Sequence, residues 1–223
     1  EVQSPGDPPM SDPLPDPAHF CARLAALGMR NGQQAVAYDS TGGFYAARLW
    51  WMLRWVGHTR AAVVDGGWDA WCKNGLPVTA QMPAIKRGAF GGAALDHTVD
   101  ANFILHRIGQ PRIRVIDARS PDRFRGENET LDPVGGHIPG AINRFFKDNL
   151  AAEGRFKPAA ELKREFSAIL GALSPEQAVH QCGSGVTACH NLLAMEIAGL
   201  SGAKLYPGSW SEWCSDPRRP VAR

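Results

Sequence analysis

Apolar and polar positions follow the same order twice along this chain. A mixed polar and apolar stretch predicts a helix, a short apolar run then predicts a strand, and a glycine-containing loop opens a strongly apolar helix that leads to a second short strand. The expected elements are a helix at about 18–29, a strand at 35–38, a helix at about 44–56 and a strand at 61–64, then a helix at about 159–171, a strand at 178–181, a helix at about 186–198 and a strand at 204–206. Strands that alternate with helices at this spacing indicate an α/β domain with a parallel sheet.

The two copies also share residues at matched positions. Gln34 corresponds to Gln177 and Gly42 to Gly185, in each case 143 positions apart. One residue is then lost, and the residues 142 positions apart are Gly57, Gly66, Trp68, Trp71 and Cys72 in the first copy and Gly199, Gly208, Trp210, Trp213 and Cys214 in the second. The separation is too long for a solenoid repeat and predicts two homologous domains in tandem.

Only the second copy has its opening half. The run 113–118 predicts a strand, and 137–143 predicts a turn into another short strand, but their counterparts in the first copy would fall at or before residue 1. We therefore expect an apparently truncated first domain at 1–80, a linker at 81–99 that proline and glycine interrupt, and a complete second domain at 100–223. The predicted fold class is α/β, with each domain a parallel sheet flanked by helices.

Composition excludes several classes of function. The chain has 223 residues, 44% of them hydrophobic and 21% charged, and a net charge of +2, which is typical of a globular domain that binds neither nucleic acid nor a membrane surface. No apolar run approaches the roughly 20 residues needed to cross a bilayer. Five cysteines at irregular spacing fit neither a disulfide framework nor a zinc site, so we expect no metal, no cofactor and a reducing, cytoplasmic location.

One cysteine stands where chemistry is expected. Cys182 follows the strand 178–181 and begins the loop that consists of Cys182, Gly183, Ser184, Gly185, Val186 and Thr187. Glycines let successive backbone N–H groups point at the sulfur, and the helix that follows adds a partial positive charge at its N-terminus. Both effects favour the thiolate, which is the nucleophile, and the hydroxyls of Ser184 and Thr187 are further donors. This interpretation requires that a donor can reach the sulfur.

The matched position in the first copy is Asp39. An aspartate there removes the nucleophile but keeps the loop. We therefore predict that the first domain is inert and the second is catalytic.

These motifs together resemble the tandem rhodanese family. The resemblance is carried by the 182–187 loop, by Gly136-His137-Ile138-Pro139-Gly140-Ala141 and by Gly208-Ser209-Trp210-Ser211-Glu212-Trp213, and the loop looks most like that of the 3-mercaptopyruvate sulfurtransferase branch. The resemblance implies a ping-pong reaction. A small-molecule donor, 3-mercaptopyruvate or thiosulfate, leaves a sulfur atom on Cys182 as a persulfide, and a thiol acceptor such as thioredoxin, or cyanide, removes it.

The resemblance also implies that arginines bind the donor anion. Arg123 matches the first such arginine of the family, and Arg125 lies beside it, so both are predicted to bind substrate. The sequence departs from the family at 127–134, which is acidic where the mercaptopyruvate branch has a second arginine, and at 12–16, where a histidine is missing. Because the loop itself is uncharged, we expect 3-mercaptopyruvate to be at least as good a donor as thiosulfate.

Other residues have structural explanations. Cys189 lies about two turns into an apolar helix and is expected in the core, as are most tryptophans, while His180 and His190 lack the spacing of metal ligands. Asp117 is expected to bind the active-site loop or to cap a helix, and Arg119 to form a salt bridge or to bind substrate.

Two alternatives belong to other classes. A tyrosine-phosphatase loop needs an arginine six residues after its cysteine, where this chain has Ala188. The second alternative is a non-catalytic rhodanese-like module that serves binding or regulation.

Overall fold

The computed structural model describes residues 14–223. Contacts divide this part of the chain into two compact units, and the division falls between His97 and Thr98, inside the segment predicted as a linker. The N-terminal unit comprises Leu14–His97 together with Leu150–Phe156, and the C-terminal unit comprises Thr98–Asn149 and Lys157–Arg223. The predicted start of the first domain and the first two residues of the 12–16 segment lie outside the described residues.

The C-terminal unit is built around a four-stranded parallel sheet with the order β4-β3-β5-β6. Its strands are β3 (Arg114–Asp117), β4 (Ile142–Asn143), β5 (Ala178–Gln181) and β6 (Lys204–Leu205), its α-helices are α4 (Ala101–Leu105), α5 (Pro121–Phe124), α6 (Ala159–Leu170), α7 (Ala188–Ile197) and α8 (Ser209–Ser215), and its 3-10 helices are η1 (Phe146–Asn149) and η2 (Pro175–Gln177). The central strand β5 is buried along its whole length, which explains why its sequence is not alternating.

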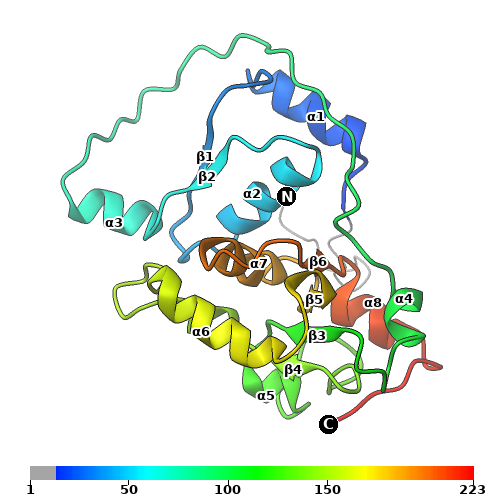
Figure 1. The fold of residues 1–223 in the computed structure, drawn as a ribbon. Coiled ribbons are helices and arrows are strands. Elements are labelled where there is room, and N and C mark those ends of the chain that lie inside the picture. Colours follow the sequence, from blue (N-terminus) through cyan, green and yellow to red (C-terminus); the bar gives the residue numbers. More distant parts are fainter. Residues whose placement is uncertain (1–13) are drawn as a thin grey trace. The chain divides into compact units, whose positions relative to one another are not determined.

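Helices cover both faces of this sheet (Figure 1). On one face α6 and α7 supply Phe166 and Met195, which contact the buried His180 of β5. On the other face a cluster of buried residues joins β3 and β5 to α4 and α8; it contains Val99, Ala101, Ile104, Val115, Ile138, Val179, Tyr206, Trp210, Trp213 and Cys214. Burial on two faces is what fixes the sheet and therefore the loops at its carboxyl edge.

The N-terminal unit repeats the second half of this arrangement. It contains α1 (Pro17–Ala26), β1 (Ala35–Ala37), α2 (Ala46–Trp55), β2 (Ala61–Val63) and α3 (Gly67–Lys73), in the order of α6, β5, α7, β6 and α8. The repeat found in the sequence is thus confirmed element by element. Within residues 14–97 the parallel sheet has only the two strands β1 and β2, so no counterpart of β3 or β4 is present there.

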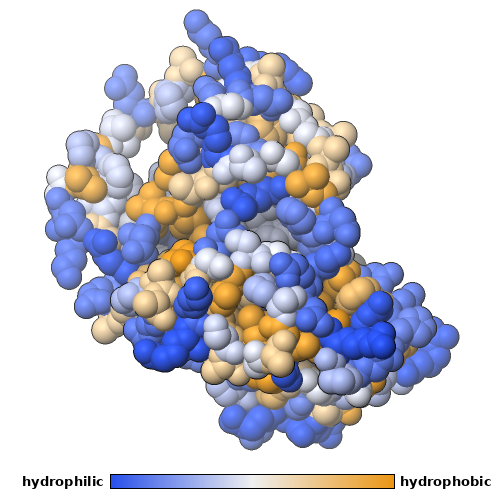
Figure 2. Space-filling model, viewed as in Figure 1, coloured by the Kyte–Doolittle hydropathy of each residue, from blue (hydrophilic) through white to orange (hydrophobic). Residues whose placement is uncertain are grey.

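The short sheet leaves apolar side chains of the N-terminal unit in contact with solvent. Val36 of β1 and Tyr38 just after it are exposed, and hydrophobic residues reach the surface beside the two strands (Figure 2). Trp68 and Cys72 of α3 are exposed as well, whereas the matched Trp210 and Cys214 of α8 are buried. Cys72 therefore does not pack as the matched Cys214 does, because α3 has no sheet face of comparable size to cover.

A segment from the second half of the sequence belongs to the N-terminal unit. Phe156 donates its N–H to the carboxylate of Asp65 at 2.8 Å, and the side chain of Arg155 lies beside Gly66. Leu150 and Phe156 form an antiparallel bridge that closes the segment into a small loop. The division into domains at 1–80 and 100–223 did not predict this insertion.

Asp39 occupies its loop as an anion. Its two carboxylate oxygens accept four backbone hydrogen bonds, from Thr41 and Gly43 on Oδ1 and from Tyr45 and Ala46 on Oδ2, at 2.8 to 2.9 Å. Partial burial alone would raise the pKa of Asp39, but these N–H donors lower it below its usual value. The loop of this fold therefore converges its N–H groups on one negatively charged side chain.

We predict that Asp39→Asn destabilises the N-terminal unit by on the order of 1–2 kcal/mol, since an amide leaves two N–H donors facing an NH₂ group. The lowered pKa of Asp39 means that its contribution is present above about pH 4 and is lost as the pH falls further. Urea unfolding measures the free energy of unfolding at pH 7 and at pH 3. This free energy should fall less between pH 7 and pH 3 in the variant than in the wild type. Equal acid sensitivity of the two proteins would contradict this role.

Candidate active site

Cys182 lies at the carboxyl edge of the C-terminal sheet. It follows β5 directly, and the end of β3 lies next to it, because the N–H of Ala118 donates to the carbonyl of Gln181 at 2.9 Å. Asp117 and Arg119 therefore reach the same edge as the cysteine. Open α/β sheets bind their ligands at this edge.

The loop after Cys182 folds back toward the sulfur. The N–H of Gly185 donates to Sγ of Cys182 at 3.1 Å. Gly185 has a φ of 84°, and a Cβ at this position would lie 2.6 Å from the carbonyl oxygen of Pro207, so no other residue fits without displacing the backbone. Thr187 is the cap residue of α7, which places the helix start two residues later than the predicted Val186.

The start of α8 holds the loop from below. Ser209 Oγ accepts the N–H of Cys182 at 3.1 Å and donates to the carbonyl of Tyr206 at 2.9 Å. The N–H groups of Trp210 and Ser211 donate to the carbonyls of Cys182 and Gly183, both at 3.0 Å. Ser209 has a φ of 52°, and no other non-glycine residue in 14–223 has a positive φ. Such local backbone strain is typical of functional sites.

Solvent reaches the loop more than it reaches the thiol. Cys182 is only 2% exposed, whereas Gly183, Ser184 and Val186 are each partly exposed. Among the described residues, Cys182 is therefore buried beneath the loop that follows it. Its sulfur is less accessible to a donor than the sequence-based interpretation requires. A donor has to reach it through the half-buried part of the loop.

Arg123, on α5, is brought to this loop. A Cβ built on Gly183 would lie 3.6 Å from both Nη1 and Nη2 of Arg123, which places the guanidinium over the residue after the cysteine. The guanidinium is also paired with two acids: Nε and Nη2 donate to Glu129 at 2.8 to 3.1 Å, and Nη2 lies 3.4 Å from Asp132. The side chain is 21% exposed.

Arg125 has a different environment. Its Nε and Nη2 donate to the two carboxylate oxygens of Glu127, both at 2.7 Å, and both side chains are about half exposed. No contact among the described residues joins Arg125 to the Cys182 loop.

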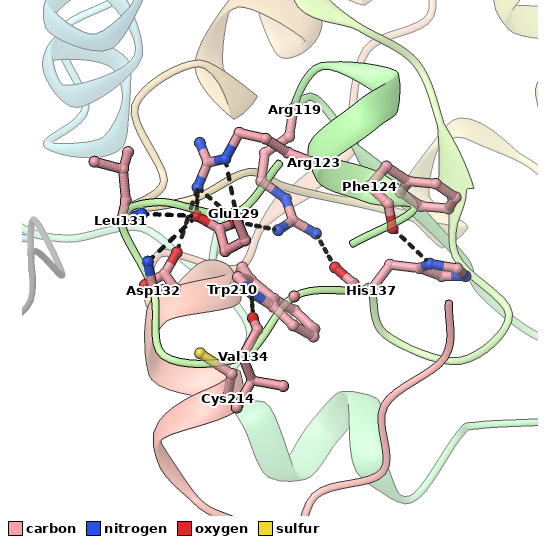
Figure 3. A network of polar contacts seen from close by, with 12 residues as sticks. Arg119, Arg123, Phe124, Glu129, Leu131, Asp132, Val134, His137, Trp210 and Cys214 are labelled. Carbon is pink, nitrogen blue, oxygen red and sulfur yellow. Dashed lines mark hydrogen bonds and ion pairs between the residues drawn. The ribbon is translucent and has the colours of Figure 1, made fainter. Parts of the chain in front are cut away.

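Glu129 connects the arginines of the site (Figure 3). It accepts hydrogen bonds from Arg123, from Nη1 of Arg119 at 3.3 Å and from the N–H groups of Leu131 and Asp132 at 3.1 and 3.2 Å. Burial alone would raise the pKa of Glu129, but the hydrogen bonds from Arg123 and the backbone lower it. Glu129 was assigned no role from the sequence, although the acidic character of 127–134 was its signal.

Arg119 is a structural cation beneath the site. It forms a buried ion pair with Asp117 at 2.7 Å, donates to the carbonyl of Gly136 and lies over the ring of Trp210. Burial alone would lower its pKa, but the charges of Asp117 and Glu129 raise it. Asp117 therefore neither caps a helix nor contacts the 182–187 loop in the described bonds; its partners are the N–H and guanidinium of Arg119.

Cys189, Cys214 and His180 are buried and have structural surroundings. Cys189 is fully buried, and its thiol donates to the carbonyl of Gly185 at 3.5 Å; burial also raises the pKa of the Cys214 thiol to about 11. Burial lowers the pKa of His180 to about 3, so this ring is neutral. Within residues 14–223 no group of three or more histidine, cysteine or acidic side chains could hold a metal ion, and no helix is long and apolar enough to span a membrane.

Comparison with known protein families shows which family has this fold and this cysteine loop. The model of the rhodanese-like domain matches residues 4–74 and 100–216. The chain belongs to the rhodanese-like family. The two matched segments confirm two tandem rhodanese-like domains of α/β class.

The named relatives of this rhodanese-like chain are 3-mercaptopyruvate and thiosulfate sulfurtransferases. It is 48% identical over 214 residues to a probable 3-mercaptopyruvate sulfurtransferase of Pseudomonas aeruginosa, which covers 94% of this chain and 75% of the relative. It is 38% identical over 204 residues to a thiosulfate sulfurtransferase of Gallus gallus, covering 90% of this chain and 70% of the relative. The crystal structure of SseA from Escherichia coli, described as a 3-mercaptopyruvate sulfotransferase, superimposes with a TM-score of 0.77 at 32% identity, covering 93% of this chain and 78% of that one.

We predict that Gly185→Ala lowers stability by about 1–3 kcal/mol, because its Cβ would meet the Pro207 carbonyl and its φ would be strained. Gly183→Ala is the matched control, since its Cβ meets only the flexible end of Arg123 at 3.6 Å. Thermal unfolding should give a clearly lower Tm for Gly185→Ala than for Gly183→Ala. A Gly185→Ala protein as stable as Gly183→Ala would show that the loop is not held as described.

Proposed function

We propose that this chain is a sulfurtransferase that moves sulfane sulfur from 3-mercaptopyruvate or thiosulfate to a thiol or cyanide acceptor through a persulfide on Cys182. The observation that carries the proposal is the hydrogen bond from Gly185 N–H to the Cys182 sulfur, at the sheet edge where Arg123 also lies. The names of the relatives from Pseudomonas aeruginosa and Gallus gallus support both donors.

In the first half-reaction the sulfur of Cys182 attacks the donor sulfur, and an S–S bond forms. With 3-mercaptopyruvate the C–S bond breaks, and the electron pair leaves on pyruvate as its enolate, which then takes up a proton. With thiosulfate the S–S bond of the donor breaks, and sulfite leaves. In both cases the 182–187 loop stabilises negative charge on sulfur with backbone N–H groups.

In the second half-reaction the acceptor attacks the outer sulfur of the persulfide. A thiolate becomes a persulfide, or cyanide becomes thiocyanate, and the electron pair of the broken S–S bond returns to Cys182. A thiol protein such as thioredoxin as acceptor and a cytoplasmic location are part of the proposal, since both fit a chain whose five cysteines are all free in the described structure.

Arg123 is the proposed binding group for the donor carboxylate. Its guanidinium lies over Gly183, and planar N–H pairs suit carboxylate oxygens. The predicted contribution of Arg125 has no support among the described contacts, because Glu127 occupies its Nε and Nη2 groups.

A non-catalytic binding module is the competing function, and the burial of Cys182 favours it. It retains the fold but needs no reactive thiol. The two functions differ in one observable, which is whether the buried cysteine takes up sulfur.

We expect a mass gain of about 32 units on Cys182 after treatment with 3-mercaptopyruvate or thiosulfate. Cys182→Ser should abolish both the gain and sulfur transfer, whereas Cys189→Ser should keep most of the transfer, because that thiol only packs and donates to the Gly185 carbonyl. Peptide mass spectrometry and a cyanide or dithiothreitol assay measure the two effects. No mass gain with either donor would leave the binding module as the better account.

A further inference from the structure

Two edges of the Arg123 guanidinium differ in their partners. The edge formed by Nε and Nη2 donates to both oxygens of Glu129. Nη1 has no hydrogen-bond partner among residues 14–223, and it lies 3.6 Å from the position of a Cβ on Gly183. Nη2 lies at the same distance of 3.6 Å, so the edge of the guanidinium that faces the loop consists of Nη1 and Nη2, and Nη2 already donates to Glu129.

Glu129 is itself held in place. Its side chain is 3% exposed, and besides Arg123 it accepts from Arg119 and from two backbone N–H groups of its own loop. Figure 3 shows the carboxylate between the two arginines, with Asp132 on the same side of Arg123. Turning Arg123 toward a donor would break several half-buried hydrogen bonds, so its fixed orientation is part of the site.

Two acids, Glu129 and Asp132, offset the positive charge of Arg123 near the loop. Arg123 contributes one positive charge, and Glu129, ionised at neutral pH, contributes one negative charge within 3 Å of it. A donor at Gly183 therefore meets the guanidinium edge of a neutralised pair instead of a full positive charge.

We propose that Glu129 sets donor selectivity: it fixes Arg123 with its Nη1–Nη2 edge toward the loop and cancels its charge, so that the site takes a monoanionic carboxylate in preference to a dianion. The inference deepens the proposed function and rests on it. The monoanion is 3-mercaptopyruvate, whose thiol is mostly protonated near neutral pH, and the dianion is thiosulfate.

Coulomb energy scales with the product of the charges, so one unit of positive charge added at Arg123 favours thiosulfate about twice as strongly as 3-mercaptopyruvate. Glu129→Gln makes this change and keeps an oxygen that can accept the backbone N–H groups. The wild type should prefer 3-mercaptopyruvate, and the ratio of kcat/KM for thiosulfate to that for 3-mercaptopyruvate should rise roughly fivefold in the variant. The rise should shrink at high salt, because added ions screen the extra charge.

Glu176→Gln is the matched control. It makes the same charge change at an exposed residue of η2, which precedes β5 and so lies at the opposite end of that strand from Cys182. Its donor ratio should stay within about twofold of the wild type. Asp132 lies 3.4 Å from Arg123, and Asp132→Asn should shift the donor ratio in the same direction by a smaller factor. This variant replaces Glu129→Gln in the test if Glu129→Gln unfolds below the assay temperature.

Three results would overturn the inference while the proposed function stands. The donor ratio of folded Glu129→Gln could stay within twofold of the wild type, or it could shift toward 3-mercaptopyruvate. The third result is a shift in Glu176→Gln equal to that in Glu129→Gln. Absence of transfer from either donor in the wild type would overturn the proposed function, and the inference with it.

Discussion

The N–H of Gly185 donates to the sulfur of Cys182 at 3.1 Å, and this bond folds the loop back onto the cysteine. A left-handed glycine packed against the Pro207 carbonyl turns the chain back, and the hydroxyl of Ser209 fixes the cysteine from its other side. The N-terminal unit supplies an internal comparison, because its matched loop directs four N–H groups at Asp39. A loop that stabilises a carboxylate in one copy is suited to a sulfur anion in the other.

Charge around the site is arranged so that few groups remain uncompensated. Arg119 is neutralised by Asp117 below the sheet edge, and Arg123 by Glu129 beside the loop. Buried pairs of this kind contribute little net stability, but they fix geometry, and here they fix the Arg123 guanidinium, which faces the cysteine loop. Selectivity among anionic donors then depends on an acid that itself never needs to contact the substrate.

The fold could be predicted largely from the sequence, because the two copies place the same kinds of residue at the same turns and packing positions. Matched glycines and tryptophans mark the same turns and packing positions, and the apolar strand 178–181 became the buried β5. The partners of Glu129 and Asp117 lie within 10 positions, but a sequence with several acids and arginines in this stretch does not show which of them pair. The role of Ser209 and the insertion of 150–156 into the N-terminal unit could not be predicted, since both depend on contacts with segments distant in sequence. Burial of Cys182 was missed for the same reason: sequence shows a loop, but not how closely α8 packs beneath it.

The crystal structure of the protein after incubation with 3-mercaptopyruvate tests the central claim most directly. The account predicts additional electron density bonded to Sγ of Cys182, with the outer sulfur within hydrogen-bonding distance of N–H groups from the 183–187 loop. An unmodified Cys182 in crystals of protein that has turned over the donor, or a second sulfur on another cysteine, would contradict it.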